Sequence, residues 1–524
     1  MTDTSAAPPL DSKQARFLFV TCFVALVATS FAFIIRALIV GDWAAQFNLS
    51  ETQKGEIFGA GIWPFAISII LFSFFIDRIG YGKAMAFAFA CHFSSVFITI
   101  FAWDYWSLYA GNFIAGLGAG TVEAAINPVI AAMYPKAKTK WLNILHAGWP
   151  GGLVLGGLLA LSLNPGGLIG QHFDPAPSWH WKVGLLLIPT IAYGVMLLGC
   201  RFPQSERVAA GVPYMDMLKQ FGAGGAFIAL GLVLTQLVIV GFQIANVENP
   251  GNTPLYIGLG LTVLLSAIFF AITKALGHWL FLFLLLIMIL LATTEIGTDG
   301  WIGQLMGPVM EAEFKIDGGW VLVYTATIMM VLRLFAGPIV KALNPLGLLA
   351  VSCVLAACGL AFLSTAQGLV IIAAATIYGL GQTFFWPTTL GLIAERFPKG
   401  GALTLNAIAG VGMLGVGILG FPFLGNIQDR QTDRTLAAEQ PALYQQVASE
   451  DAQASVLGSY RKLDLDAIEA LDEDDQAVIT DVQNTSKQSA LFQVAALPLI
   501  MLVCYLALLV YFKKQGGYKA IELT

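Results

Sequence analysis

Five charged side chains lie well inside the apolar segments of this chain. They are Arg36, Glu123, Glu295, Asp299 and Arg333. A charge at the centre of a membrane helix costs about 2.5–3.5 kcal/mol on insertion scales, so each of these groups needs a partner or a purpose. Such residues either serve an ion or proton pathway or form permanent ion pairs that hold helices together, and the sequence leaves both possibilities open.

The segment that contains Glu123 has the most polar surroundings. Asn127 follows one helical turn later, so its amide and the carboxyl share one face of a helix. Pro128 removes a backbone hydrogen bond there and exposes carbonyl groups toward a cavity. Because burial penalises the charged form of a carboxyl, we expect Glu123 to couple proton movement to function. The alternative is a lasting salt bridge between Glu123 and Arg333.

Amides and aromatic side chains accompany these charges and predict a binding site. An amide both donates and accepts hydrogen bonds, which suits a polyhydroxylated solute. His146 alone is weak support, because a histidine that packs between helices is equally expected. The candidate binding residues are Asn127, Asn143, His146, Trp149, Gln382, Trp386 and Asn406.

The remaining intramembrane charges suggest pairing across a central cavity. Arg36 and Asp299 both lie late in outward-running helices that we expect to be symmetry mates. We therefore predict that Arg36 meets Asp299 in the outer half of the cavity. Glu295 is four residues before Asp299, hence on the same helix face and also within reach of Arg36.

The elements that position these residues are membrane helices. The chain is 57% hydrophobic and 11% charged, which excludes a soluble enzyme. A helix needs about 20 apolar residues to cross a bilayer, and fourteen runs satisfy this. They span 16–40, 54–76, 84–103, 106–133, 142–163, 181–200, 223–246, 254–274, 279–306, 319–342, 346–364, 368–394, 401–423 and 490–512.

The chain also repeats itself at a spacing of 263 residues. Residues 116–157 align without a gap on 379–420, and the shared positions include Gly116-Leu117-Gly118 with Gly379-Leu380-Gly381 and Leu142-Asn143 with Leu405-Asn406. A duplicated helical membrane domain is typical of a secondary transporter, whose halves rock about a midplane site. Trp386 occupies the repeat position of Glu123, so the two halves differ in chemistry.

Charge outside the helices predicts the orientation. With the N-terminus in the cytoplasm, seventeen Lys and Arg residues lie inside and eight outside, as the positive-inside rule requires. The acidic stretch near 426–490 then faces outward as a solvated loop with one amphipathic helix near 463–481. The predicted organisation is a cytoplasmic tail over 1–15, a six-helix bundle over 16–200, a linker with two extra helices over 201–278, a second bundle over 279–512 that contains the outer loop 424–489, and a tail over 513–524.

Several motifs resemble the fucose/glucose proton-symporter branch of the major facilitator superfamily. They are Gly116-Leu117-Gly118, Glu123-x3-Asn127-Pro128 and Leu142-Asn143. Asp77-Arg78-Ile79-Gly80 with Lys83 resembles the superfamily signature between the second and third helices, and Arg333-x3-Gly337-Pro338 resembles its relic in the second half. The resemblance implies that Glu123 couples protons and that Asp77 and Arg78 join helix ends.

Two positions depart from that branch. The aspartate of its first helix has no match, since Ile35-Arg36-Ala37 occupies the region, and its sugar-contacting asparagine in the fifth helix is Trp149 here. The substrate class is therefore a sugar, polyol or nucleoside rather than fucose. Two alternatives stay open: an anion carrier that uses Arg36 and Arg333, and a transporter-like sensor that uses the outer loop.

The remaining expectations concern partners and location. No nucleophile–base motif, P-loop, CxxC pair or metal-ligand cluster is found in the sequence, so we expect no enzyme activity, no cofactor, no metal and no nucleic acid. We expect a multi-pass protein of the plasma (inner) membrane, with both termini cytoplasmic, that binds a small solute and protons. We expect a monomer, with a dimer possible through the two extra helices, which should pack at the periphery.

Overall fold

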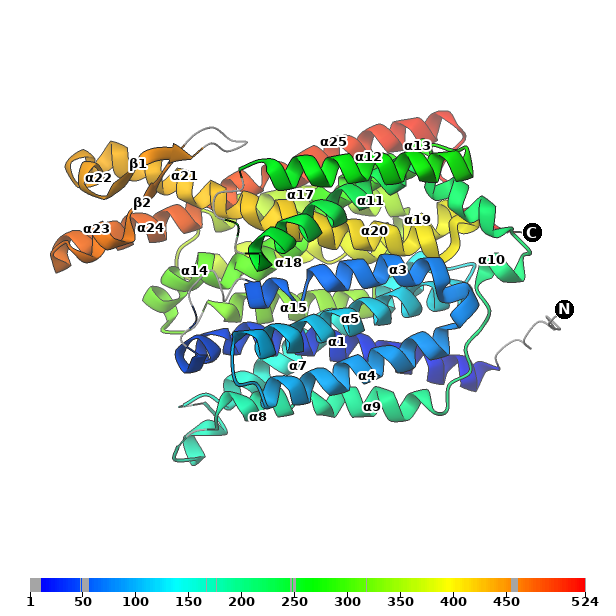
Figure 1. Cartoon of the computed structure of the whole chain (residues 1–524), viewed down its shortest axis with the longest axis horizontal. Coiled ribbons are helices and arrows are strands. Elements are labelled where there is room, and N and C mark those ends of the chain that lie inside the picture. The colour runs from blue at the N-terminus through cyan, green and yellow to red at the C-terminus, as the bar shows by residue number, and fades with distance from the viewer. Residues whose placement is uncertain are drawn as a thin grey trace.

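The computed structural model describes residues 11–47, 49, 56–165, 167–175, 177–245, 247, 251–316, 318–453 and 460–523. Thirteen helices in these residues are long and apolar enough to cross a membrane, and the bent pair Leu305–Phe314 and Gly319–Leu334 brings the number to fourteen. The predicted all-α membrane protein of about fourteen spans is confirmed. Figure 1 shows the helices running roughly parallel, with the start of α1 and the C-terminus at the same end.

The N-terminal half is one bundle of closely packed helices. α1 packs on α7, and α5 packs on both α3 and α4. Gly118 of the repeated motif allows one of these approaches, because a Cβ there would lie 2.9 Å from Cys91 Cβ. The helices are α1 (Ser12–Phe47), α3 (Trp63–Ile79), α4 (Tyr81–Ile100), α5 (Tyr105–Met133), α6 (Lys138–Leu145), α7 (Gly148–Ser162), α8 (Trp179–Gly184) and α9 (Leu187–Leu197), with a 3-10 turn η1 at Gly170–His172 and the short α10 (Glu206–Ala209).

The C-terminal half repeats this arrangement. Gly381, the repeat mate of Gly118, has the same role, since a Cβ there would meet the backbone of Ala356 at 2.3 Å. The helices are α13 (Trp279–Ala292), α14 (Thr298–Phe314), α15 (Gly319–Leu334), α16 (Ala336–Ala342), α17 (Pro345–Leu363), α18 (Val370–Gln382), α19 (Phe385–Arg396), α20 (Gly401–Gly415), α21 (Phe421–Glu439) and α25 (Ala496–Lys514), with a 3-10 turn η3 at Pro398–Gly400 and π-helical segments η2 (Thr293–Gly297) and η4 (Val416–Gly420). The halves meet where α3 packs on α20, α7 on α15 and α6 on α19.

The two extra helices lie at the periphery, as predicted. α11 (Tyr214–Ile244) and α12 (Thr253–Thr273) pack on each other, and α11 also packs on α20 and α13. Only 17% of the apolar window of each helix is buried, so most of the pair faces outward. Gly222 and Gly277 hold the base of this hairpin together at positive φ, in an approach that leaves no room for side chains.

Several of the expected spans are interrupted rather than continuous, and four of these spans belong to the region where the two halves meet. The span expected over 142–163 is α6 and α7, separated at His146 and Ala147, and the one over 368–394 is α18 and α19, separated at Thr383 and Phe384. The spans over 279–306 and 401–423 contain the π-helical segments η2 and η4. Irregular backbone inside a membrane is tolerated where it is covered by protein or lines a cavity. The interruptions therefore indicate where the functional site lies.

The acidic stretch is a small folded projection, which corrects the expected solvated loop. α21 and α24 (Glu473–Val494) extend past the bundle and carry α22 (Pro441–Val447), α23 (Leu465–Glu469) and an antiparallel pair of strands, β1 (Ala448–Gln453) and β2 (Tyr460–Leu463). Figure 1 shows it at the end opposite the C-terminus. Leu436, Leu443, Val447, Ile479 and Val482 form its core. Apolar side chains spaced among the charges supply this core, and the overall composition hid them.

Candidate functional site

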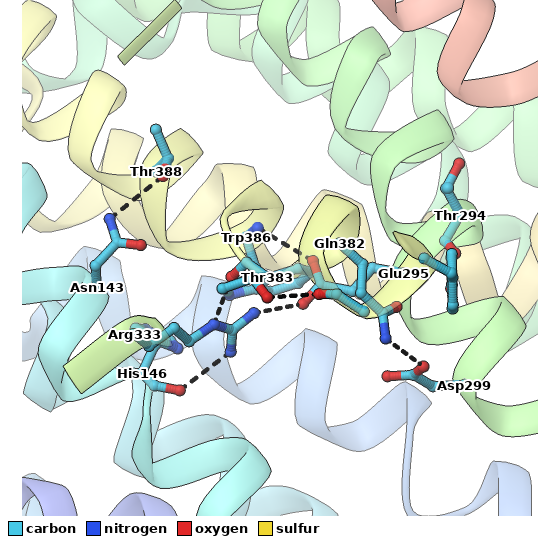
Figure 2. Close-up of polar contacts among 12 residues, drawn as sticks. Asn143, His146, Thr294, Glu295, Asp299, Arg333, Gln382, Thr383, Trp386 and Thr388 are labelled. Atoms are coloured by element: carbon cyan, nitrogen blue, oxygen red, sulfur yellow. Dashed lines mark hydrogen bonds and ion pairs between the residues drawn. The ribbon is translucent and has the colours of Figure 1, made fainter. Parts of the chain in front are cut away.

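Arg333 is the centre of a buried polar network between the two halves (Figure 2). Its guanidinium Nη2 lies 2.8 Å from Glu295 Oε1, and the exposed fractions of the two side chains are 1% and 5%. Its Nε donates to the carbonyl of Thr383 at 2.6 Å, and its Nη1 donates to the carbonyl of His146 at 3.1 Å. Each guanidinium nitrogen therefore has a partner, and Glu295 neutralises the charge.

Prolines create the two carbonyl acceptors of Arg333. Thr383 is four residues before Pro387, and His146 is four residues before Pro150. A proline has no N–H to donate to the carbonyl four residues earlier, so both carbonyls lack their helical partner. The sequence thus prepares two acceptors at the interruptions of α18–α19 and α6–α7, and Arg333 satisfies both.

Glu295 and Asp299 both face the interrupted α18–α19 span but have different partners. Glu295 lies in the π-helical segment η2, and its Oε2 accepts the backbone N–H of Trp386 at 3.1 Å. Asp299 Oδ1 accepts from Gln382 Nε2 at 3.1 Å. Figure 2 shows Gln382 and Asp299 on the side of Glu295 away from Arg333. In this structure Gln382, which we expect to bind solute, is hydrogen-bonded to Asp299.

Glu123 belongs to a second network that reaches the same cavity. Asn127 Nδ2 donates to Glu123 Oε2 at 2.8 Å, and Asn127 Oδ1 lies 2.9 Å from His146 Nε2. All three side chains are at most 2% exposed. The alternative of a permanent Glu123–Arg333 salt bridge is wrong, because Arg333 pairs with Glu295. Glu123 has no basic side chain within ion-pair distance among the described residues.

The two networks line one central cavity. Its walls are Phe65, Glu123, His146, Trp149, Glu295, Ile296, Arg333, Trp386 and Met413. The space for the centres of water-sized molecules is about 20 Å³, roughly one or two waters. Besides Glu123, five of the residues predicted from the sequence line this cavity, and they come from both halves of the protein: His146, Trp149, Glu295, Arg333 and Trp386. In this state the cavity is closed around them.

Asn143 and Asn406 tie the halves together rather than facing this cavity. Asn406 Nδ2 donates across the interface to the carbonyl of Ala124 at 3.0 Å. That carbonyl is free because Pro128 stands four residues later, as the sequence predicted. Asn143 Nδ2 donates to Thr388 Oγ1 of the other half at 3.3 Å. These repeat mates therefore have equivalent positions and reach to the opposite half.

Arg36 does not meet Asp299 or Glu295, so that predicted pairing is wrong. Its Nη2 donates to Ser95 Oγ of α4 at 3.4 Å, inside the N-terminal half. The position of Arg36 late in α1 does not determine which way the helix face turns. The face that carries Arg36 turns toward α4 and α5 and lines a second cavity beside the central one.

The predicted signature pair Asp77 and Arg78 is divided between two partners. Asp77 forms an ion pair with Arg207 of α10 at 2.5 Å. The Arg78 guanidinium lies over the ring of Tyr214, 5.2 Å from its centroid. The two contacts fasten the end of α3 to α10 and to the start of α11. The partners lie more than a hundred residues away, so spacing along the chain carried no signal for them.

A contact network that the sequence did not predict lies at the end of the molecule that carries the C-terminus. Lys138 Nζ lies 2.6 Å from Glu206 and donates to the carbonyl of Ala394 at 3.1 Å. Glu395 accepts from Thr139 Oγ1 at 2.5 Å and from Tyr518 at 2.7 Å. This network joins α6 of one half to α19 of the other and closes the cavity at this end.

Two helical halves related by a repeat, with a closed polar cavity between them, define a secondary-transporter architecture. The family model for the Major Facilitator Superfamily matches residues 17–422, so the chain belongs to that superfamily and is a multi-pass integral membrane protein.

Similar proteins agree with this assignment. A gentisate transporter of Corynebacterium glutamicum is 26% identical over 161 residues, which cover 30% of this chain and 34% of that protein, so the alignment spans about a third of the relative. The structure of the proton:xylose symporter XylE matches with a TM-score of 0.59 at 12% identity, and the match covers 95% of this chain and 96% of the XylE chain. The E. coli fucose:proton symporter FucP has a TM-score of 0.57 at 13% identity, with 94% and 99% covered. These structures share the fold.

Proposed function

We propose that this protein is an alternating-access symporter that uses Glu123 to couple proton entry to uptake of a small hydroxylated solute such as a sugar. The observation that carries the proposal is the pairing pattern of the buried carboxylates. Glu295 is neutralised by Arg333, whereas Glu123 is joined only to Asn127 and, through it, to His146. A buried carboxyl without a cation favours its neutral form, which suits proton loading and release.

Asn127 can link the protonation of Glu123 to the solute. With Glu123 ionised, the amide donates to the carboxylate and its oxygen accepts from His146 Nε2. A protonated Glu123 would donate instead, so the amide would turn over and present its N–H group to His146 Nε2. His146 would then carry its proton on Nδ1. Because His146 lines the cavity, the hydrogen bond offered to the solute would change with Glu123.

The walls of the cavity support a neutral, hydroxylated ligand at the centre. Trp149 and Trp386 supply flat apolar surfaces from opposite halves, and Glu123 and His146 supply hydrogen-bonding groups. The similar structures include a xylose and a fucose symporter. The guanidinium of Arg333 is fully hydrogen-bonded within the protein, which disfavours its use as an anion-binding group. Arg36 stays a candidate anion-binding group, because the relative that transports gentisate, a hydroxylated acid, supports this part of the anion-carrier alternative.

The halves must separate for any such solute to enter. A cavity with room for one or two waters cannot hold a sugar. Opening at the end that carries the C-terminus would break the Asn143–Thr388 and Thr139–Glu395 contacts. We propose that this end is cytoplasmic and that the protein works as a monomer in the plasma (inner) membrane, in line with the distribution of Lys and Arg.

The test is uptake into proteoliposomes with and without an inward proton gradient, with labelled D-xylose, L-fucose and gentisate as probes. We expect the gradient to drive accumulation of at least one probe by the wild type. Glu123→Gln should abolish this accumulation but keep exchange of the same probe at equilibrium. The control is Glu311→Gln, the same change at an exposed residue of α14. Gradient-driven accumulation by Glu123→Gln at the wild-type level would refute the proposal.

A further inference from the structure

A second cavity lies inside the N-terminal half, beside the central one. Thr29, Ala32, Phe33 and Arg36 line it from one face of α1, and α3, α4 and α5 supply most of the other walls. Its space for water-sized centres is about 50 Å³, or room for about four waters. The cavity is large enough for a small charged group but too small for a whole solute.

Arg36 brings an uncompensated charge into this cavity. The side chain is 8% exposed, and its Nε is buried without a hydrogen-bond partner. Its protein hydrogen bond, Nη2 to Ser95 Oγ, is long at 3.4 Å. No carboxylate lies within ion-pair distance of Arg36 in the part of the chain that the structure describes. A charge buried in this way is not a structural ion pair, so it marks a functional site.

His92 offers a second unused hydrogen-bonding group to the same cavity. Its Nδ1 lies 3.0 Å from the hydroxyl of Tyr193, whereas its Nε2 is buried without a partner. When the Tyr193 hydroxyl donates to Nδ1, the imidazole proton lies on Nε2, which becomes a donor. A cationic guanidinium and an imidazole N–H group then face one space, which is the donor set that binds an oxyanion.

The second cavity and the central cavity share part of their walls. Phe65, Trp149 and Met413 line both spaces, so a ligand that passes this shared wall would touch both. One end would then lie at Arg36 and the other at Glu123 and His146. The shared wall is apolar and partly aromatic, which suits the carbon skeleton of a solute between two polar ends.

We infer that Arg36, supported by His92, binds a carboxylate group of the transported solute. The inference rests on the proposed function and narrows its substrate to a hydroxylated monocarboxylate, either a sugar acid or a hydroxylated aromatic acid. The hydroxyl end lies against Glu123 and His146, and the carboxylate end lies against Arg36. One proton entering with one monoanion carries no net charge, so the cycle is electroneutral and responds to a pH gradient but not to a membrane potential.

The experiment compares acids with their uncharged counterparts in wild-type proteoliposomes, so it does not depend on a variant that must fold. The pairs are 4-hydroxybenzoate with 4-hydroxybenzyl alcohol, and D-gluconate with D-glucitol. We expect one of the two acids to exchange with an apparent affinity about tenfold to a hundredfold higher than its alcohol, from the lost charge-assisted hydrogen bonds. The acid that exchanges identifies the class. A potassium–valinomycin potential should leave its proton-driven uptake unchanged.

The variant arm assigns the preference to Arg36. Arg36→Gln should reduce the acid-to-alcohol ratio at least tenfold, Arg36→Lys should keep part of it, and Arg201→Gln, at an exposed arginine, should change nothing. An unchanged ratio in Arg36→Gln, or no preference for either acid in the wild type, would overturn the inference. Proton-driven, potential-sensitive uptake of a neutral sugar would also overturn it but would leave the proposed role of Glu123 intact.

Discussion

Removing Arg333 should destabilise the protein far more than removing Arg36, although both are buried membrane arginines. Arg333→Met leaves the Glu295 carboxylate with one backbone N–H group as its partner and leaves the carbonyls of Thr383 and His146 without Arg333. With 1% and 5% of the two side chains exposed, water cannot replace the lost partner. Breaking a buried pair by removing one member costs about 3–5 kcal/mol.

A double variant separates the effect of the Arg333–Glu295 ion pair from the other effects of replacing Arg333. Arg333→Met combined with Glu295→Gln leaves no unpaired charge, so it should be more stable than Arg333→Met alone. The coupling free energy should fall within or above the range of about 0.5–3 kcal/mol found for directly interacting residues. The charge, rather than the lost volume, accounts for most of the difference.

Unfolding of purified protein in detergent, followed by heating or by titration with a denaturing detergent, measures these effects. Arg36→Met is the matched control, and it should be neutral or stabilising because Arg36 has no ion-pair partner in the described residues. If Arg333→Met and Arg36→Met destabilised the protein equally, or if the Glu295 and Arg333 changes were additive, the assignment of the ion pair would be refuted.

Three further predictions concern the contacts between the halves and the extra helices. Asn406→Ala removes a hydrogen-bond donor at the interface between the halves, so it should destabilise the closed state by about 1–3 kcal/mol and favour separated halves. Spin labels at Lys136 and Lys399, in matching turns of the two halves, should then report longer distances. An unchanged distance distribution would contradict this. Glu395→Gln should lengthen the same distance by weakening the network at that end, whereas a shorter distance would argue against it. Gly258→Leu should destabilise the α11–α12 hairpin, because a Cβ there lies 2.8 Å from a neighbouring helix backbone, and proton-driven uptake per folded molecule should be unchanged.

The fold followed from features that act locally. Runs of about 20 apolar residues predicted the spans, and the gap-free repeat predicted the two halves. Pro128 also predicted a free carbonyl, which the structure shows at Ala124 with Asn406 as its donor. The equivalent carbonyls before Pro150 and Pro387 could have been found by the same rule, and they identify the acceptors of Arg333.

The pairing of the charges could not be predicted in this way. The sequence placed Arg36 late in its helix, but the partner of a charge also depends on the rotation of each helix about its axis. The π-helical segment at Glu295 and the interruptions beside His146 and Thr383 change that rotation locally. Long-range contacts such as Asp77 with Arg207 arise only from tertiary packing. The domain limits, orientation and oligomeric state stay predictions.

The proposed role of Glu123 in proton coupling can be measured directly as proton movement triggered by solute. Proteoliposomes loaded with a pH-sensitive dye and held at equal pH inside and outside receive a transported probe on the outside. We expect acidification of the lumen by the wild type and none by Glu123→Gln, although the variant still exchanges the same probe. Equal acidification by Glu123→Gln and the wild type would contradict the assignment of Glu123 as the proton-coupling residue.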